Sequence, residues 1–343
     1  MYRNSRSLRY GSFFAGAMLY VCTLGAAQQK PNEEILGKNA QSIKNIVEVV
    51  SYPDKSIQSS KVFNTYSRVA VVSPDKTSFI TVGDKNATVV DLLSGNKLQL
   101  FPVYGPGISS AIFSLDGKKV GIVPSVKVWS IKSGGELTML RSPTANVKTL
   151  AFSPDGRSMV TGSLDGAVKL WDTQSGKELR TSVGHVGPVV ASAFSLDGRK
   201  IATGSFDETA RLWNTETGAE LRVLQKHTKA VVAVAFSPDG KRLITGSEDG
   251  TAKVWDTESG AELRTLSRHT KPVRAVAFSP DGEKVATGSA DKTAKVWDPE
   301  SGSELKTFQG HTDTILSVSF SADGQTLYTA SKDETIRVWN VNS

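Results

Sequence analysis

The residues of this chain that could do chemistry are its serines, histidines and aspartates, and they recur at a fixed interval. The four histidines lie 42 residues apart, at His185, His227, His269 and His311. Each is followed by a serine 20 residues later and by an aspartate 22 residues later. These three residue types make the nucleophile, base and orienting carboxylate of a hydrolase. A hydrolase needs one activated nucleophile in one cleft, whereas a set repeated four times in register indicates structure.

Motifs for metal or cofactor chemistry are absent from the sequence. Cys22 is the only cysteine, so the chain forms neither an intrachain disulfide nor a thiolate metal cluster. No glycine-rich phosphate loop and no Cys/His metal spacing occurs. Successive histidines belong to different repeat units, which makes them poor partners for one metal ion. We therefore predict no catalytic residues, no metal and no cofactor.

The elements that position these residues follow the same period. All six tryptophans are 42 residues apart, at Trp129, Trp171, Trp213, Trp255, Trp297 and Trp339. A period in the low forties is typical of β-propeller blades. A seventh, degenerate unit lies upstream, with Val90 in the place of tryptophan and Ser94-Gly95 following it as Ser259-Gly260 follow Trp255.

Each unit divides into four short strands. In the sixth unit we expect strands at 272–278, 284–288, 293–297 and 303–308, separated by turns such as Ser279-Pro280-Asp281-Gly282. The first strand of a unit is continuously apolar, as at 231–236, and the fourth is more polar, as at 262–266. A strand buried on both faces belongs innermost, and a half-solvated strand belongs at the rim.

The ring must close, because an open end would expose an apolar sheet face and unpaired strand edges. The last unit contains only three strands, and residues 45–50 and 57–63 both read as strands that could complete it. The sequence therefore predicts an all-β protein, a seven-bladed β-propeller of four-stranded antiparallel blades whose last blade is closed by an N-terminal strand.

The motif resembles that of the WD-repeat propeller family over about residues 55–343. In that family a histidine, a strand serine or threonine, a turn aspartate and a tryptophan form a structural hydrogen-bond relay. The resemblance implies four complete relays: His185, Ser205, Asp207 and Trp213; His227, Ser247, Asp249 and Trp255; His269, Ser289, Asp291 and Trp297; and His311, Ser331, Asp333 and Trp339. The third unit has Pro143 at the histidine position, and the first two units are still less complete, so we expect blades 1–3 to be less regular and less stable.

The resemblance also implies a function. It implies a non-catalytic scaffold that binds a protein or peptide partner on the face formed by the loops between strands d and a and between strands b and c. Side chains of the family that project there correspond to Leu164, Phe206, Pro188, Val190, Val232, Arg274, Leu316 and Lys332. Exposed apolar clusters with charged rims favour protein interfaces. The alternative is a propeller enzyme, or a protein that binds a carbohydrate or other small ligand in the central channel.

The N-terminal segment differs from the rest. Residues 1–27 carry three arginines, an uncharged stretch and a small-residue end, the pattern of a secretory signal peptide; an uncleaved membrane anchor and a transit peptide are the alternatives. Residues 28–43 read as a linker and 44–343 as the propeller. We expect a secreted or periplasmic monomer, with a membrane association only if the anchor is retained. The net charge is +7, but both signs are interspersed, which disfavours nucleic acid as a partner.

Overall fold

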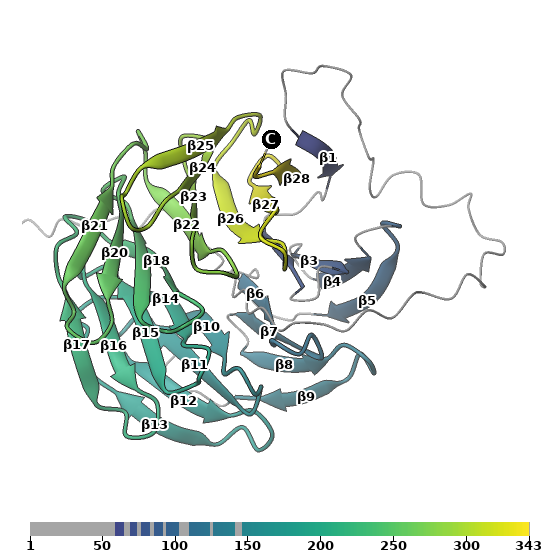
Figure 1. The fold of residues 1–343 in the computed structure, drawn as a ribbon. Coiled ribbons are helices and arrows are strands. Elements are labelled where there is room, and N and C mark those ends of the chain that lie inside the picture. The colour runs from purple at the N-terminus through teal and green to yellow at the C-terminus, as the bar shows by residue number, and fades with distance from the viewer. Residues whose placement is uncertain are drawn as a thin grey trace, which may run out of the picture.

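Seven four-stranded antiparallel sheets stand in a ring in the computed structural model (Figure 1). The structure describes residues 59–64, 69–73, 77–82, 86–91, 94–102, 110–123, 126–140 and 146–342, and all regular elements in these ranges are strands. The predicted all-β, seven-bladed propeller is confirmed. We call the four strands of a blade a to d, from the centre outward.

The inner two strands of each blade surround the central axis. The a strands are β2 (Val69–Val72), β6 (Ser110–Phe113), β10 (Val147–Phe152), β14 (Val189–Phe194), β18 (Val231–Phe236), β22 (Val273–Phe278) and β26 (Ile315–Phe320). The b strands are β3 (Ser78–Val82), β7 (Lys119–Val123), β11 (Ser158–Ser163), β15 (Lys200–Ser205), β19 (Arg242–Ser247), β23 (Val285–Ser289) and β27 (Thr326–Ser331).

The outer two strands complete each sheet. The c strands are β4 (Asn86–Asp91), β8 (Lys127–Ser130), β12 (Val168–Asp172), β16 (Ala210–Asn214), β20 (Ala252–Asp256), β24 (Ala294–Trp297) and β28 (Thr335–Asn340). The d strands are β5 (Lys97–Pro102), β9 (Glu136–Met139), β13 (Glu178–Ser182), β17 (Glu220–Leu224), β21 (Glu262–Leu266), β25 (Glu304–Phe308) and, for blade 7, β1 (Ser59–Asn64).

The turn between strands a and b is encoded by its own side chains. In blade 6 the Ser279 hydroxyl donates to the Asp281 carboxylate (2.5 Å), and the Gly282 amide donates to the Ser279 carbonyl (2.9 Å). Gly282 has a φ of 73°, which a side chain would strain. The same Ser–Asp contact recurs in blades 2 to 5 and 7. These turns make the hairpins from which each blade is built.

The core lies between blades, and every tryptophan faces the preceding blade. Trp255 of blade 5 packs with Ala202 and Leu212 of blade 4, for example. The contact closes tightly: a Cβ on Gly204 would lie 2.8 Å from the carbonyl oxygen of Val231 in the next blade. Neighbouring sheets therefore pack face to face and form one ring-shaped core. Its close contacts are those expected of a protein interior, which is packed as densely as an organic crystal.

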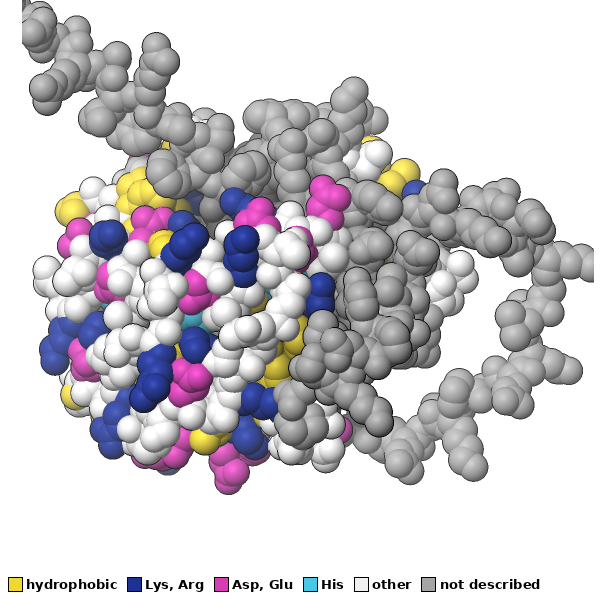
Figure 2. All heavy atoms as spheres, turned by 90° about the horizontal axis from the view of Figure 1, so that it is seen from above, with side chains coloured by type: hydrophobic (Ala, Val, Ile, Leu, Met, Phe, Trp, Pro, Cys, Tyr) yellow, Lys and Arg dark blue, Asp and Glu magenta, His cyan; other side chains and the backbone are white. Residues whose placement is uncertain are grey.

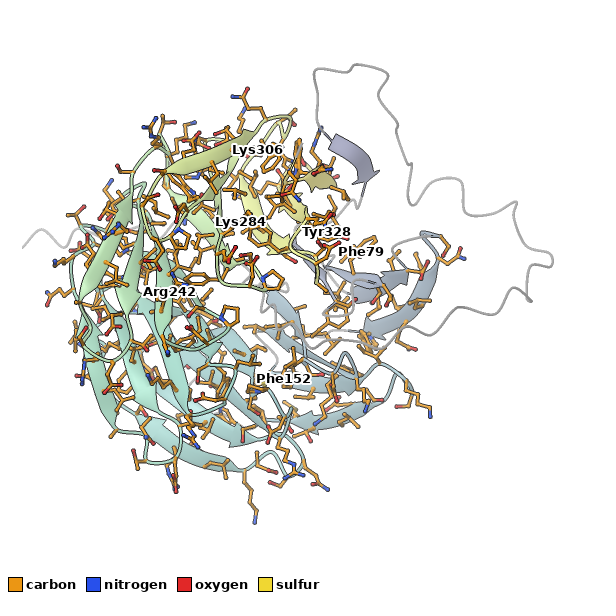
Figure 3. All side chains as sticks on the ribbon, in the orientation of Figure 1. Phe79, Phe152, Arg242, Lys284, Lys306 and Tyr328 are labelled. Atoms are coloured by element: carbon orange, nitrogen blue, oxygen red, sulfur yellow. The ribbon has the colours of Figure 1, made fainter. Side chains whose placement is uncertain are left out.

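The ring closes between blades 1 and 7. Phe79 packs against Tyr328 across this junction, where Figure 3 shows the two side chains together. The strand β1 pairs antiparallel with β28, with Phe63 opposite Ile336. The predicted closure by an N-terminal strand is thus confirmed, and the second of the two expected pieces supplies it.

The signal peptide predicted for 1–27, the linker predicted for 28–43 and the strand piece at 45–50 lie outside the described residues. Within the described ranges, no helix has the length and apolar character that crossing a membrane requires.

Candidate functional site

A chain of buried hydrogen bonds ties the two loops of each regular blade together on one face. In blade 4 the indole N–H of Trp213 donates to the hydroxyl of Thr203 (2.8 Å), which lies 2.8 Å from Nε2 of His185. Nδ1 of the same histidine lies 2.8 Å from Asp207, whose carboxylate also accepts the backbone N–H of Val186 (3.1 Å). The d–a loop is thereby fastened to the b–c turn.

Three further blades repeat this geometry almost unchanged. The histidine lies 2.8 Å from the aspartate and 2.7 Å from the threonine in each of blades 5, 6 and 7. The indole N–H donates to the threonine hydroxyl at 2.9, 2.8 and 2.8 Å. The sets are His227, Thr245, Trp255 and Asp249; His269, Thr287, Trp297 and Asp291; and His311, Thr329, Trp339 and Asp333.

The prediction that Ser205, Ser247, Ser289 and Ser331 supply the relay hydroxyl is wrong. Ser205 donates to the Gly187 carbonyl (3.0 Å) and accepts the Asp207 amide (3.1 Å), so it fixes the turn instead. Its counterparts make the same two backbone contacts. Threonine and serine are two residues apart and share one face of strand b. The inward–outward alternation of side chains therefore cannot tell the two hydroxyls apart. Only their different positions along the strand bring the threonine to the indole and the serine to the loop backbone.

The order of donors and acceptors in the relay determines which ring nitrogen of the neutral histidine carries the proton. Threonine accepts from the indole, so its own proton is available to Nε2, and Nδ1–H donates to the carboxylate. Burial lowers the pKa of His185, although the hydrogen bond to Asp207 acts to raise it. Burial alone would raise the pKa of Asp207, but hydrogen bonds from Thr209 and His185 outweigh it and lower the pKa. The pair is therefore an aspartate with a neutral imidazole.

Thr203, His185 and Asp207 have the distances of a catalytic triad, yet a substrate has no access to them. The side chain of His185 is 0% exposed, Thr203 is fully buried, and its hydroxyl already accepts the Trp213 N–H. The serines that first invite a hydrolase interpretation contact backbone, not imidazole. Among the described residues no group of three His, Cys, Asp or Glu could hold a metal ion. The sets act as structural fasteners.

Blades 1 to 3 lack parts of the fastener. In blade 3 Trp171 still donates to Thr161 (2.9 Å), while Pro143, at the histidine position, lies outside the described residues. In blade 2 the strand register places Ile122 where Thr161 stands in blade 3. Isoleucine accepts no hydrogen bond, and among the described residues the buried Nε1 of Trp129 has no partner.

In blades 3 to 7, backbone hydrogen bonds hold the b–c turns to the d–a loops. The residue before each turn aspartate donates its amide to a carbonyl of the d–a loop, as Phe206 does to Pro188 (2.9 Å). The equivalent pairs are Leu164 with Asn146, Glu248 with Ala230, Ala290 with Pro272 and Lys332 with Thr314, at 2.9 to 3.1 Å. Side chains at this position therefore project from backbone that is held by hydrogen bonds.

The expected partner-binding residues divide into two groups. Leu164 and Phe206 are 41% and 39% exposed, and Lys332 is exposed as well. Pro188 is half-buried, and half-buried Arg274 pairs with Glu248 (2.8 Å) between blades 5 and 6. The expectation that Val190, Val232 and Leu316 are exposed is wrong, since all three are buried. Each is the extra residue of a bulge in its a strand, and Val190 and Val232 pack with Ala230.

Val186 is the member that the sequence reasoning missed. It is 89% exposed, one residue after the relay histidine, where blades 5 to 7 have Thr228, Thr270 and Thr312. The loops around it touch: a Cβ on Gly166 would lie 2.5 Å from the His185 carbonyl oxygen, and one on Gly187 would lie 3.0 Å from the Asp207 amide. We call Leu164, Val186 and Phe206 the apolar sector. A comparison of equivalent repeat positions would have found it.

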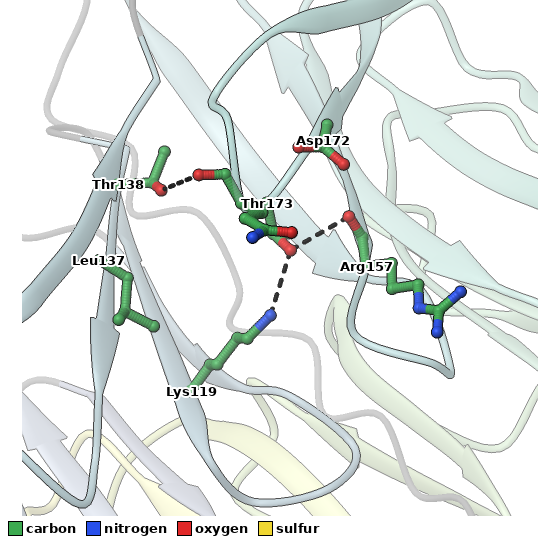
Figure 4. A pocket seen from close by; sticks show the side chains of 7 residues that line it. Lys119, Leu137, Thr138, Arg157, Asp172 and Thr173 are labelled. Atoms are coloured by element: carbon green, nitrogen blue, oxygen red, sulfur yellow. Dashed lines mark hydrogen bonds between the residues drawn. The ribbon is translucent and has the colours of Figure 1, made fainter.

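The opposite face carries the a–b and c–d turns and a pocket of about 540 Å³ between blades 2 and 3 (Figure 4). Lys119 reaches across it to the Thr173 hydroxyl (3.2 Å) and the Gly156 carbonyl (2.8 Å). Asp172 also lines the pocket, so its walls carry both positive and negative charges. On the side that Figure 2 shows, basic and acidic side chains are likewise interspersed.

Two family models match parts of the sequence. The model of the WD domain, G-beta repeat, matches residues 134–172 and 176–214, and each range contains the d strand of one blade and strands a to c of the next, β9 to β12 and β13 to β16. The model of the second β-propeller of echinoderm microtubule-associated protein matches residues 198–343, from strand b of blade 4 to strand c of blade 7. No curated protein matches the chain significantly.

Proposed function

Because the chain belongs to the WD-repeat β-propeller family, we propose that it is a non-catalytic scaffold that binds a protein partner through the apolar sector of blades 3 and 4. Propellers of this family are typically protein-interaction scaffolds. The single observation that carries the proposed site is the exposure of Leu164, Val186 and Phe206 on one rigid face.

The other regular blades show why this sector differs from ordinary loop surface. The position of Leu164 and Phe206 is taken by Glu248, Ala290 and Lys332 in blades 5 to 7. Large apolar side chains therefore collect on blades 3 and 4, whereas blades 5 to 7 have none at this position. Such clusters with polar surroundings characterise protein interfaces, and a rigid backbone lowers the entropy that binding costs.

Affinity capture from the native source tests this site. We would compare the wild-type chain with the triple variant Leu164→Ser, Val186→Ser and Phe206→Ser, and identify captured proteins by mass spectrometry. A matched control is Leu179→Ser together with Leu305→Ser, because these leucines, 41% and 53% exposed, are at least as exposed as Leu164 and Phe206 but lie on d strands at the outer rim. We expect the partner to be lost from the triple variant and kept by the control.

The opposite results would reject the sector. Retention of every captured protein by the folded triple variant would place the binding surface elsewhere on the propeller. Loss of the same proteins from both variants would show that general surface hydrophobicity, not this face, retains them. Unchanged melting temperatures would verify that the three substitutions act on binding alone.

We also propose that the protein works outside the cytoplasm, on the pattern of residues 1–27. Cleavage after Ala27 would leave a mature chain that begins at Gln28. Intact-mass measurement of protein purified from its native compartment distinguishes this mature chain from an uncleaved, anchored one.

A further inference from the structure

Each of blades 2 to 6 places a buried or half-buried cation of its c strand against a glutamate that begins its d strand. The cations Lys169, Lys253 and Lys295 are buried. The pairs are Lys127–Glu136 (2.6 Å), Lys169–Glu178 (2.8 Å), Lys253–Glu262 (3.2 Å), Lys295–Glu304 (3.0 Å) and Arg211–Glu220. A buried charge needs a partner of opposite sign, because burial removes its hydration.

Blade 7 keeps the cation, but the described residues of the blade supply no carboxylate to it. Arg337 is 9% exposed, and its guanidinium carbon lies 6.0 Å from the ring centre of Trp339. Toward the described part of the chain it makes no hydrogen bond or ion pair, whereas Arg211, whose buried Nε is likewise unpaired, pairs with Glu220 through Nη1. The register explains the loss: the β1 residue opposite Trp339 is Ser59, where blades 2 to 6 have glutamate.

The surroundings of Arg337 match those that hold an arginine–glutamate pair in blade 4. There, a Cβ on Gly184 would lie 2.7 Å from Nη1 of Arg211 and 2.9 Å from the Glu220 carboxylate. In blade 7, a Cβ on Gly310 would lie 2.8 Å from Nη1 of Arg337. Blades 5 and 6, which use lysine as the cation, have Lys226 and Arg268 at this loop position. Blade 7 thus retains the arginine and the glycine of a carboxylate site.

The strand β1 is also attached differently from the other d strands. Each d strand of blades 1 to 6 is joined to its c strand by a short turn, whereas β1 comes from the distant N-terminal side and meets β28 only by pairing (Figure 1). The register shift between Ser59 and Lys61 recurs at the same place in the c–d pairing of blades 1 to 6, so a segment with the register of those d strands fits beside β28. Replacement of β1 along β28 therefore breaks no hairpin.

We propose that the outer edge of blade 7 binds an extended segment of a partner protein, which replaces β1 beside β28 and presents a glutamate to Arg337. The d strands define the chemistry of this segment. It starts with glutamate and carries a large apolar residue four positions later, as Leu224, Leu266 and Phe308 do where they are fully buried. Backbone pairing supplies affinity, and the carboxylate and the apolar side chain supply specificity. The proposal does not depend on the apolar sector.

A peptide-binding experiment with the full chain tests this inference. The probe is a fluorescent peptide with the sequence of residues 303–309, and its matched control has glutamine in place of the glutamate. We expect saturable binding of the probe and at least tenfold weaker binding of the glutamine peptide. Arg337→Met should cause a similar loss. Ser59→Glu should weaken binding too, because it supplies the carboxylate within β1. Lys295→Met, which removes the equivalent cation from blade 6, should leave binding unchanged.

Several results would overturn the proposal. They are no binding at millimolar peptide, equal binding of the two peptides, or an equal loss in Lys295→Met and Arg337→Met. If Ser59→Glu raised the melting temperature while wild type bound no peptide, Arg337 would be a packing defect of the closing blade and not a binding site. Hydrogen exchange adds an independent readout, since the probe should expose β1 amides while it protects those of β28.

Discussion

Replacement of the relay threonine in blade 5 by valine, Thr245→Val, isolates the buried hydroxyl from the shape of the side chain. The hydroxyl accepts the indole N–H of Trp255 (2.9 Å) and lies 2.7 Å from Nε2 of His227, and Thr245 is fully buried. Valine fills the same volume but leaves two buried polar atoms unpaired. Each unpaired atom costs about 1–3 kcal/mol, so we expect a loss of about 3 kcal/mol in the free energy of unfolding.

Thermal and urea unfolding, followed by tryptophan fluorescence, measure this loss. A domain of this size has an unfolding entropy of about 0.6 kcal/mol per kelvin, so 3 kcal/mol lowers the melting temperature by about 5 °C. The comparison variant is Ser247→Ala, which removes contacts to loop backbone groups only and should cost about 1 kcal/mol. A loss in Ser247→Ala equal to or larger than that in Thr245→Val would refute the assignment of threonine to the relay.

Three further predictions follow from the same contacts. Trp255→Phe should cost about 1–2 kcal/mol more than Trp129→Phe in urea unfolding, because only the indole N–H of Trp255 has an acceptor. Stability should fall as the pH drops below about 6.5 and more steeply below about 4: the folded pKa values of His185 and Asp207 lie below their ordinary values of 6.5 and 3.8, so the unfolded chain binds more protons there. A midpoint that rises on acidification would contradict this. Glu208→Gly should raise the free energy of unfolding by about 0.5–1 kcal/mol, because Glu208 has a φ of 69° where blade 3 has glycine; an unchanged midpoint would show that the turn carries no strain.

The fold was largely predictable because it depends on signals that recur. Tryptophan every 42 residues and a Ser-x-Asp-Gly turn after the a strand of blades 2 to 7 specify six blades, and the degenerate unit upstream gives the seventh. Closure needed a further argument, that an apolar sheet face must be covered. The sequence left two pieces for this role because both read as strands. Only the pairing of Phe63 with Ile336 distinguishes the piece that closes the ring.

The site was less predictable, for two physical reasons. Ser205 and Thr203 lie on the same face of one strand, and only the reach of the indole shows which hydroxyl it meets. Val190 and Val232 were expected at the surface, but each lies at a bulge in its a strand that directs the side chain into the packed interior. Residue spacing in the sequence does not reveal such a bulge. Val186, by contrast, follows from the sequence alone once its blade is compared with its neighbours.

The relay and the apolar sector meet in blade 4, and this gives a final test that separates stability from recognition. His185 is hydrogen-bonded to Asp207, and the same carboxylate accepts a hydrogen bond from the backbone N–H of Val186. The imidazole therefore helps to fix Asp207, which follows Phe206, and the loop that carries Val186. His269 makes equivalent contacts in blade 6, where Ala290 replaces Phe206 on the b–c turn.

His185→Ala and His269→Ala should therefore lower the melting temperature by similar amounts, since both imidazoles are 0% exposed and equally bonded. Partner affinity, measured well below both melting temperatures, should fall about tenfold in His185→Ala, an effect of about 1.4 kcal/mol. It should change less than about twofold in His269→Ala, because that loop presents no sector residue. Equal losses in the two variants would mean that the relay affects binding only through global stability, and no loss in either would mean that the partner does not touch the blade 4 loops.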